Sequence, residues 1–280
     1  MSYRRLIKLI IKPFYKTNFG QKFIGRFIDY TVASPLMRRI FTKNYSSGFL
    51  SVGEQNRFCV APNWITVDLD GADYNIDLRK KERLPFKDGS ISLIYSSHMI
   101  EHLNDETCQF FFQEASRLLS KNGVLRLEAP DTIKIVDAYK SKDIGFFEKM
   151  LNKDEKKRLG VEFDLFDVFV GLLSCYIVEG KHIGVKVPRD EALSMLNSAS
   201  PEEFAKWCIS FQDDWQKLSG GHINPITYKK LKNNLIDAGF TNISEMSIGQ
   251  SKSTLMQSKL KNIERTHRGY FSVIAEAAFH

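Results

Sequence analysis

The chain lacks the long apolar runs and the clustered cysteines that mark several classes of protein. None of its 280 residues lies in an apolar run of about 20 residues, the length that a membrane-spanning helix needs. The first residues also lack the apolar core and cleavage pattern of a signal peptide. The four cysteines are far apart and form no Cys-x-x-Cys pair, which argues against a zinc or disulfide framework. These absences predict a cytoplasmic protein.

Acidic residues are almost absent from the first 45 positions, where ten Lys or Arg stand beside a single acid, Asp29. The segment is +9 in a chain whose net charge is +7, so the remainder is −2. Residues 1–45 alternate basic and bulky apolar residues, as an amphipathic helical arm does. Such an arm can contact the anionic inner face of a membrane peripherally or hold a phosphorylated substrate; the alternative is a helix packed on the domain. The rest of the chain has no RNA-binding signature, so we expect no nucleic-acid partner.

Short apolar runs alternate with polar turns and a helical pattern in the segment that follows. The runs are residues 49–52, 64–67, 91–95 and 124–127. Apolar residues between 110 and 119 recur at helical spacing, and Gly123 is the glycine expected just past a helix end. This order predicts a parallel sheet with crossover helices.

A second group of elements is predicted near the end of the chain. The residues before Gly239 read as a helix that this glycine ends. Residues 242–248 and 270–278 read as the last two strands, a hairpin that makes the sheet mixed.

The residues directly after the strands are the candidates for ligand contacts, because ligands of open α/β sheets bind outside the carboxyl ends of the strands. Gly53 follows the first run and Asp68 the second. An acidic side chain at the second position can accept both hydroxyls of a ribose. Asp77 follows a further short run and can meet an adenine ring, and Ser97 and His98 follow the fourth strand.

Four phrases resemble one family in their order and spacing. They read NWITVDL at 63–69, LPFKDGS at 84–90, SSHMIEHL at 96–103 and GVLRLEAPD at 123–131. They are similar to class I S-adenosylmethionine (SAM)-dependent methyltransferases, of the type 11-like kind found in bacterial surface-polysaccharide pathways. The resemblance covers about residues 49–131, with a shorter echo at 222–243.

The resemblance implies an α/β fold with a Rossmann-like seven-stranded mixed sheet. The long, aromatic-rich segment at 132–220 adds a mostly helical cap insertion to it, and the charge pattern adds the basic N-terminal arm. It divides the chain into the arm at 1–45, a SAM-binding half at 46–131, a cap or substrate insertion at 132–220, and the end of the sheet at 221–280. It also implies a SAM cofactor and a small-molecule or glycan acceptor. The predicted reaction is O-methylation of a saccharide, a nucleotide sugar or a phosphorylated glycan precursor.

The implied cofactor contacts are Gly53, Glu54, Asp68, Leu69, Asp77, Leu78 and Ser97. The family usually has two or three glycines after the first strand, where a Cβ would block the cofactor. Here only Gly53 remains, with Glu54 and Gln55 behind it. One hypothesis is that Glu54 contacts the ammonium group of SAM. The alternative is a catalytically silent, methyltransferase-like binding protein.

Histidines are the candidates for a general base, because an acceptor hydroxyl must lose a proton and imidazole titrates near neutral pH. His98 is favoured by its place at the strand end and His222 by a loop expected to return to the same rim. His102 is read as a structural histidine. The prediction is that the enzyme has no metal; the alternative is a soft metal held by His98, Glu101 and His102, with His222 as a further ligand.

Overall fold

The computed structural model describes residues 48–54, 64–150, 164–178, 181–212, 220–264 and 268–279. The predicted basic arm at residues 1–45 lies outside the described residues, as does Gln55. No helix in the described part of the chain is long and apolar enough to cross a membrane.

Seven strands form one sheet in the order β3-β2-β1-β4-β5-β9-β8, which confirms the predicted seven-stranded mixed sheet. The five strands from β3 to β5 are parallel, whereas β9 runs antiparallel to both β5 and β8. Their bounds are β1 Phe49–Val52, β2 Ile65–Asp68, β3 Tyr74–Asn75, β4 Ile91–Ser97, β5 Leu119–Pro130, β8 Asn242–Met246 and β9 Ser272–Ala278. Four of the strands fall on the apolar runs of the sequence.

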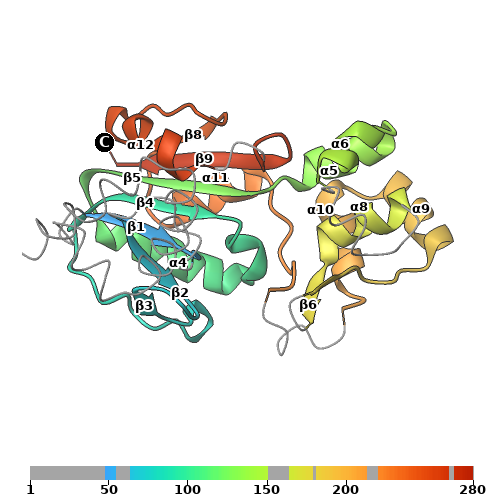
Figure 1. Ribbon diagram of the computed structural model, residues 1–280, viewed down its shortest axis with the longest axis horizontal. Helices are drawn as coiled ribbons and strands as arrows, with labels where there is room; N and C mark the ends of the chain where they lie inside the picture. The colour runs from blue at the N-terminus through green and yellow to red at the C-terminus, as the bar shows by residue number, and fades with distance from the viewer. Residues whose placement is uncertain are drawn as a thin grey trace, which may run out of the picture.

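Both faces of the sheet are covered, which is why its central strands are apolar on both sides. On one face, Ile94 of β4 packs in the same cluster as residues of helices α4 (Asp105–Leu118) and α11 (Tyr228–Asp237). On the other, Leu93 packs in the cluster that includes helix α12 (Thr254–Ile263). Figure 1 shows α12 on the opposite side of the sheet from α4.

Two local predictions are wrong. Helix α4 ends at Leu118 and β5 begins at Leu119, so Gly123 lies inside a strand and not at a helix end. Its small size still matters there, since a Cβ would stand 2.8 Å from a methyl carbon of Leu119. The last two strands are antiparallel neighbours, but helix α12 lies between them, so they do not form a simple hairpin. Gly239, at φ +92°, follows α11 as predicted.

The chain after β5 forms a mainly helical group with a hydrophobic core of its own. Phe169 stacks on Phe204, with ring centroids 5.5 Å apart, and on Tyr139, at 4.1 Å. Figure 1 shows this group beside the sheet, reached from the end of β5. That these helices close over an acceptor stays a prediction. The group contains α5 Thr132–Lys140, α6 Ile144–Met150, α8 Leu165–Ser174, α9 Arg189–Ser198, α10 Pro201–Ile209 and the small hairpin of β6 Tyr176–Val178 and β7 Lys181–Ile183.

Candidate active site

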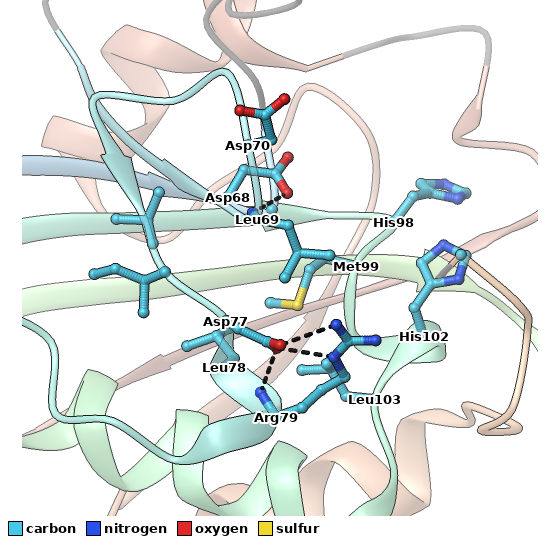
Figure 2. A pocket seen from close by; sticks show the side chains of 14 residues that line it. Asp68, Leu69, Asp70, Asp77, Leu78, Arg79, His98, Met99, His102 and Leu103 are labelled. Carbon is cyan, nitrogen blue, oxygen red and sulfur yellow. Dashed lines mark hydrogen bonds and ion pairs between the residues drawn. The ribbon is translucent and has the colours of Figure 1, made fainter. Parts of the chain in front are cut away.

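A cavity of about 600 Å³ lies at the carboxyl ends of β1, β2 and β4. Its acids come from the end of β2, the loop that follows it and the turn after β3, and its histidines come from the turn after β4 (Figure 2). Since these strands are parallel neighbours, their carboxyl ends meet at one edge of the sheet. The lining residues are Gly53, Val67, Asp68, Leu69, Asp70, Ile76, Asp77, Leu78, Arg79, His98, Met99, His102, Leu103 and Gly220.

Gly53 directly follows β1, and its backbone has a left-handed conformation with φ +83°. A Cβ at this position would stand 2.3 Å from Cγ of Met99, a side chain that also lines the cavity. Only glycine combines this backbone conformation with such a close approach. The backbone at the end of β1 is therefore free of a side chain on the cavity side.

Asp68 ends β2 and is a half-buried acid of the cavity. Its Oδ1 accepts the N–H of Leu69 at 2.6 Å, which turns the carboxylate along the strand end. Burial raises the pKa of the Asp68 carboxyl, an effect that the N–H of Leu69 opposes. Asp68 thus has the place that the sequence predicted for a ribose-binding acid.

Asp77 lines the cavity with its carboxylate already paired to a cation. Arg79 donates to Asp77 through Nε at 2.8 Å and Nη2 at 2.9 Å, and Asp77 also accepts the N–H of Arg79 as the cap of a short 3₁₀ helix, η1 (Leu78–Lys80). The hydrogen bond from Arg79 lowers the pKa of Asp77. Leu78 is buried below it, whereas Leu69 is 45% exposed at the cavity mouth.

Two predicted cofactor contacts are not among the residues that line the cavity. Glu54 is half-buried, and its Oε2 accepts the hydroxyl of Ser51 at 2.9 Å. The hydroxyl of Ser97 donates to Oε2 of Glu128 at 3.0 Å, beside the phenol of Tyr95 at 2.9 Å. Contacts of Glu54 and Ser97 with the cofactor stay predictions.

His98 follows β4 with φ +52°, a conformation that is uncommon for a residue with a Cβ. Its Nδ1 lies 3.3 Å from Oε1 of Glu101, an ion-pair contact, and its Nε2 lies 3.1 Å from the hydroxyl oxygen of Ser272. The ring also packs edge-on against Phe271. The hydroxyl of Ser272 donates its proton to the carbonyl of Arg268 at 2.9 Å, so its oxygen can accept a proton from Nε2 of His98. The carboxylate at Nδ1 favours the other tautomer, in which the proton is on Nδ1 and the lone pair is on Nε2.

His102 and His222 come together although 120 positions separate them in the sequence. Their ring centroids are 5.1 Å apart, and together with Glu101 they form a group whose ligand atoms lie within 4.8 Å of one another. Glu101 and His102 belong to a second 3₁₀ helix, η2 (Ile100–His102). Burial lowers the pKa of His102, against the attraction of Glu101. Burial raises the pKa of Glu101, but the closeness of His98, His102 and His222 outweighs this effect and lowers it to about 2.

The predicted return of the His222 loop to this rim occurs, although His222 itself does not line the cavity. The backbone N–H groups of Ile223 and Asn224 both donate to the carbonyl of Glu101, at 2.9 and 3.1 Å. The N–H of His222 donates to the carbonyl of Cys175 in the helical group at 2.7 Å. These bonds hold the loop between η2 and the helical group.

Sequence reasoning missed several lining residues. Met99 and Leu103 stand inside the SSHMIEHL phrase, so their position after the fourth strand was a usable signal. Ile76 belongs to the short run before Asp77 that was read as a strand end, so its position was also a usable signal. Arg79 carried no such signal. His102, read as structural, does hydrogen-bond through Nδ1 to the carbonyl of Gly221 at 2.9 Å, and it also lines the cavity.

Residues 61–127 match the family model described as a methyltransferase domain. The match covers less than half of the chain, and a comparison with curated proteins finds no match. Similar solved structures include the protein PigF with SAH (S-adenosylhomocysteine), at 13% identity over 92% of this chain and 70% of that one, with a TM-score of 0.36. A SAM-dependent methyltransferase from Mesorhizobium loti is also similar, at 13% identity over 82% and 89%, with a TM-score of 0.37.

Residues 61–127 are thus similar to a methyltransferase domain, and they include β2, β3, β4 and most of β5 of the mixed seven-stranded sheet that has the cavity at its strand ends. The match supports a methyltransferase, and SAM is the cofactor that the sequence resemblance implies. The residues of the cavity fit that cofactor, since the backbone at Gly53 leaves room where a Cβ would clash and Asp68 is directed along the strand end.

Proposed function

We propose that this methyltransferase acts on a hydroxyl group of a saccharide, a nucleotide sugar or a phosphorylated glycan precursor. The observation that carries the O-directed part is His98, which lines the cavity and has a buried carboxylate, Glu101, 3.3 Å from its Nδ1. A base that is oriented by a carboxylate suits an acceptor that must lose a proton. The saccharide part is supported by the resemblance of the sequence phrases and by the basic residues at 1–45.

In this proposal, different residues of the cavity contact the ribose, the amino-acid part and the adenosine part of the cofactor. Asp68 accepts hydrogen bonds from the ribose, and Gly53 lets the amino-acid part of the cofactor approach the backbone. The bound cofactor supplies an activated methyl group on a sulfonium, whose leaving group is already good. Leu69, Leu78 and Asp77 then stand around the adenosine part, with the pairing to Arg79 holding the Asp77 carboxylate in place.

His98 takes the proton of the acceptor hydroxyl through Nε2. The acceptor replaces the hydroxyl of Ser272, which now lies 3.1 Å from that nitrogen. The imidazolium that forms is stabilised by Glu101 at Nδ1 and by Glu128, whose Oε1 lies 4.0 Å from Nε2. His222 stays a second candidate for the base.

The acceptor class is tested by incubating the full-length protein with SAM and matched pairs of acceptors that differ only in one amine or hydroxyl. The pairs include nucleotide sugars, sugar phosphates and neutral saccharides. We expect SAH release and a methylated product with the hydroxyl acceptors, the phosphorylated ones preferred. Methylation of the amine partner alone would contradict the O-directed proposal, and equal rates on non-saccharide alcohols would contradict the saccharide part.

Replacing Asp68 with alanine should weaken SAM binding by about 1–3 kcal/mol, or about 5- to 150-fold in Kd, because the ribose loses its hydrogen-bond acceptor. Calorimetric titration with SAM and with SAH measures this directly. Asp190→Ala, at an exposed acid of α9, is the charge-matched control and should bind as the wild type does. Unchanged affinity in the Asp68 variant would mean that the ribose is held elsewhere.

Location is part of the proposal. We expect the enzyme to work in the cytoplasm, with the basic residues at 1–45 in peripheral contact with the anionic inner face of a membrane. That segment lies outside the described residues, so the contact depends on its sequence alone.

A further inference from the structure

The carboxylate of Glu101 is buried, and its nearest basic neighbours are histidines. The residue is 2% exposed, and apart from the contact of Oε1 with Nδ1 of His98, neither Oε1 nor Oε2 has a hydrogen-bond partner within the described part of the chain. The nearest basic atoms are Nδ1 of His98 at 3.3 Å and Nε2 of His102 at 3.8 Å. An ionised carboxylate that is buried in this way is stable only when positive charge stands beside it.

The imidazoles of His102 and His222 lie beside this carboxylate, and each ring is fixed by a hydrogen bond from its Nδ1 to a backbone carbonyl. Nδ1 of His102 donates to the carbonyl of Gly221 at 2.9 Å, and Nδ1 of His222 donates to the carbonyl of Leu172 at 2.7 Å. With the protons on Nδ1, the lone pairs are on the two Nε2 atoms. Metal-binding histidines are held in this manner, with the free ring N–H donating to a backbone carbonyl or a carboxylate.

The backbone around the group is fixed on each side. The carbonyl of Glu101 accepts two N–H groups from the segment after His222, and the side chain of Gln212 donates to the carbonyl of His222 at 2.7 Å. The ligand atoms of Glu101, His102 and His222 lie within 4.8 Å of one another. Ligands about 2.0–2.2 Å from a tetrahedral ion lie about 3.3–3.6 Å apart, so side-chain adjustments of about 1 Å bring all three onto one ion.

We propose that Glu101, His102 and His222 bind one divalent transition-metal ion and leave a further coordination position open toward the cavity. Two imidazoles and one carboxylate suit zinc and its first-row neighbours, whereas magnesium prefers oxygen ligands only. Three protein ligands with an open position are typical of a catalytic ion and not of a structural one. His98 stays outside the ligand set, because its Nε2 faces Ser272 and its Nδ1 reaches Glu101 from the cavity side.

The position of the site has a consequence for the reaction, which rests on the proposed function. His102 lines the cavity beside His98, so an acceptor oxygen near His98 would also lie near the open position of the ion. A coordinated hydroxyl loses its proton more readily than a free one. His98 would then receive that proton while the ion holds the oxygen. Metal binding itself needs neither SAM nor an acceptor.

The test measures metal uptake by the full-length protein, produced without a polyhistidine tag, stripped with a chelator and dialysed. Calorimetric titration with Zn²⁺ should show one equivalent bound, and elemental analysis after gel filtration should recover the same stoichiometry. Mg²⁺ should give no comparable binding. Cobalt(II) loading should produce the strong visible absorption of a four- or five-coordinate site, whereas the weak spectrum of hydrated cobalt would overturn the proposal.

His222→Ala and His102→Ala should each weaken Zn²⁺ binding by at least about 100-fold, because each removes one of three protein ligands. His98→Asn is the matched control within the same cluster, and it should keep the stoichiometry and lose less than about tenfold in affinity. Loss in His98→Asn with retention in His222→Ala would overturn this ligand set in favour of His98, Glu101 and His102.

If the wild type takes up no zinc, protonated histidines neutralise Glu101 and the proposal is wrong. If a variant does not fold, the cobalt spectrum of the wild type decides the question alone. All of these results are independent of any methyl transfer.

Discussion

Replacing His98 with asparagine should lower kcat by about 100- to 10,000-fold, the range that a positioned general base contributes. Asparagine is the informative replacement because it tolerates a positive φ, and His98 has φ +52°. The variant keeps the backbone turn that directs the chain from β4 into η2, but it cannot accept a proton. Kd for SAM should change little, since the lost group acts on the acceptor. Steady-state kinetics with the best acceptor, together with calorimetry for SAM, separates the two effects.

The pH profile distinguishes a base from a structural histidine. Only a neutral imidazole can accept the proton, so the wild-type kcat should rise with pH, and the His98→Asn enzyme should lack that rise. Ser272→Ala is the matched control, because it removes the hydroxyl at Nε2 and leaves the imidazole. It should retain most of the activity. A His98→Asn enzyme with full kcat would remove His98 from the mechanism and leave His222 as the candidate base.

Replacing Arg126 with methionine should lower the free energy of unfolding by about 3–5 kcal/mol, the usual effect of removing one partner from a buried ion pair. The guanidinium is fully buried in β5. It pairs with Glu264 at the end of α12 and, at 2.6 Å, with Glu276 in β9, and it also donates to the carbonyls of Ser247 and Gln250. Without it, two carboxylates stay buried without their cation. Thermal unfolding should occur on the order of 10 °C lower.

Neutralising the two acids tests the electrostatic origin of this loss. The triple variant Arg126→Met, Glu264→Gln, Glu276→Gln should recover much of the lost Tm, because no uncompensated charge remains. Arg83→Met removes an arginine from an exposed pair with Asp88 and should leave Tm almost unchanged. Equal Tm losses in Arg126→Met and in Arg83→Met would contradict the argument.

The Arg126→Met deficit should also depend on pH. Burial raises the pKa of Glu264, and loss of the guanidinium should raise it further. A carboxyl whose pKa is higher in the folded state takes up its proton first in the folded state as the pH falls. Stability of the variant therefore approaches that of the wild type at low pH, and the difference is largest near neutral pH. Tm measured across the acidic range checks this direction.

Several parts of the fold could be predicted because they depend on neighbouring residues. The runs that became β1, β2, β4 and β5 are apolar on both faces, as buried parallel strands are. Helix α4 has apolar residues at helical spacing and begins after Asn104, whose side chain accepts the N–H of Thr107. Gly239 ends α11 with a positive φ that few other residues adopt easily.

The elements that were missed are those whose form depends on distant partners. Helix α12 has only three apolar positions on its buried side, Met256, Leu260 and Ile263, and these pack against the far face of the sheet. Gly123 read as a helix end, but β5 already begins at Leu119, which pairs with Ile91, and from Val124 onward the strand pairs with both β4 and β9. Local propensity is weak against such pairing.

The sequence by itself determined the strands, the carboxyl ends at which a ligand binds, and the acid and histidine that follow two of them, Asp68 and His98. These follow from short-range periodicity and from the rule that parallel strands end at one edge. Only the tertiary structure decided that Arg126 of β5 pairs with Glu276 of the neighbouring strand β9, and that His222 lies beside Glu101 and His102. Both depend on strand register and on the path of a long connection, which are set by packing between residues more than a hundred positions apart.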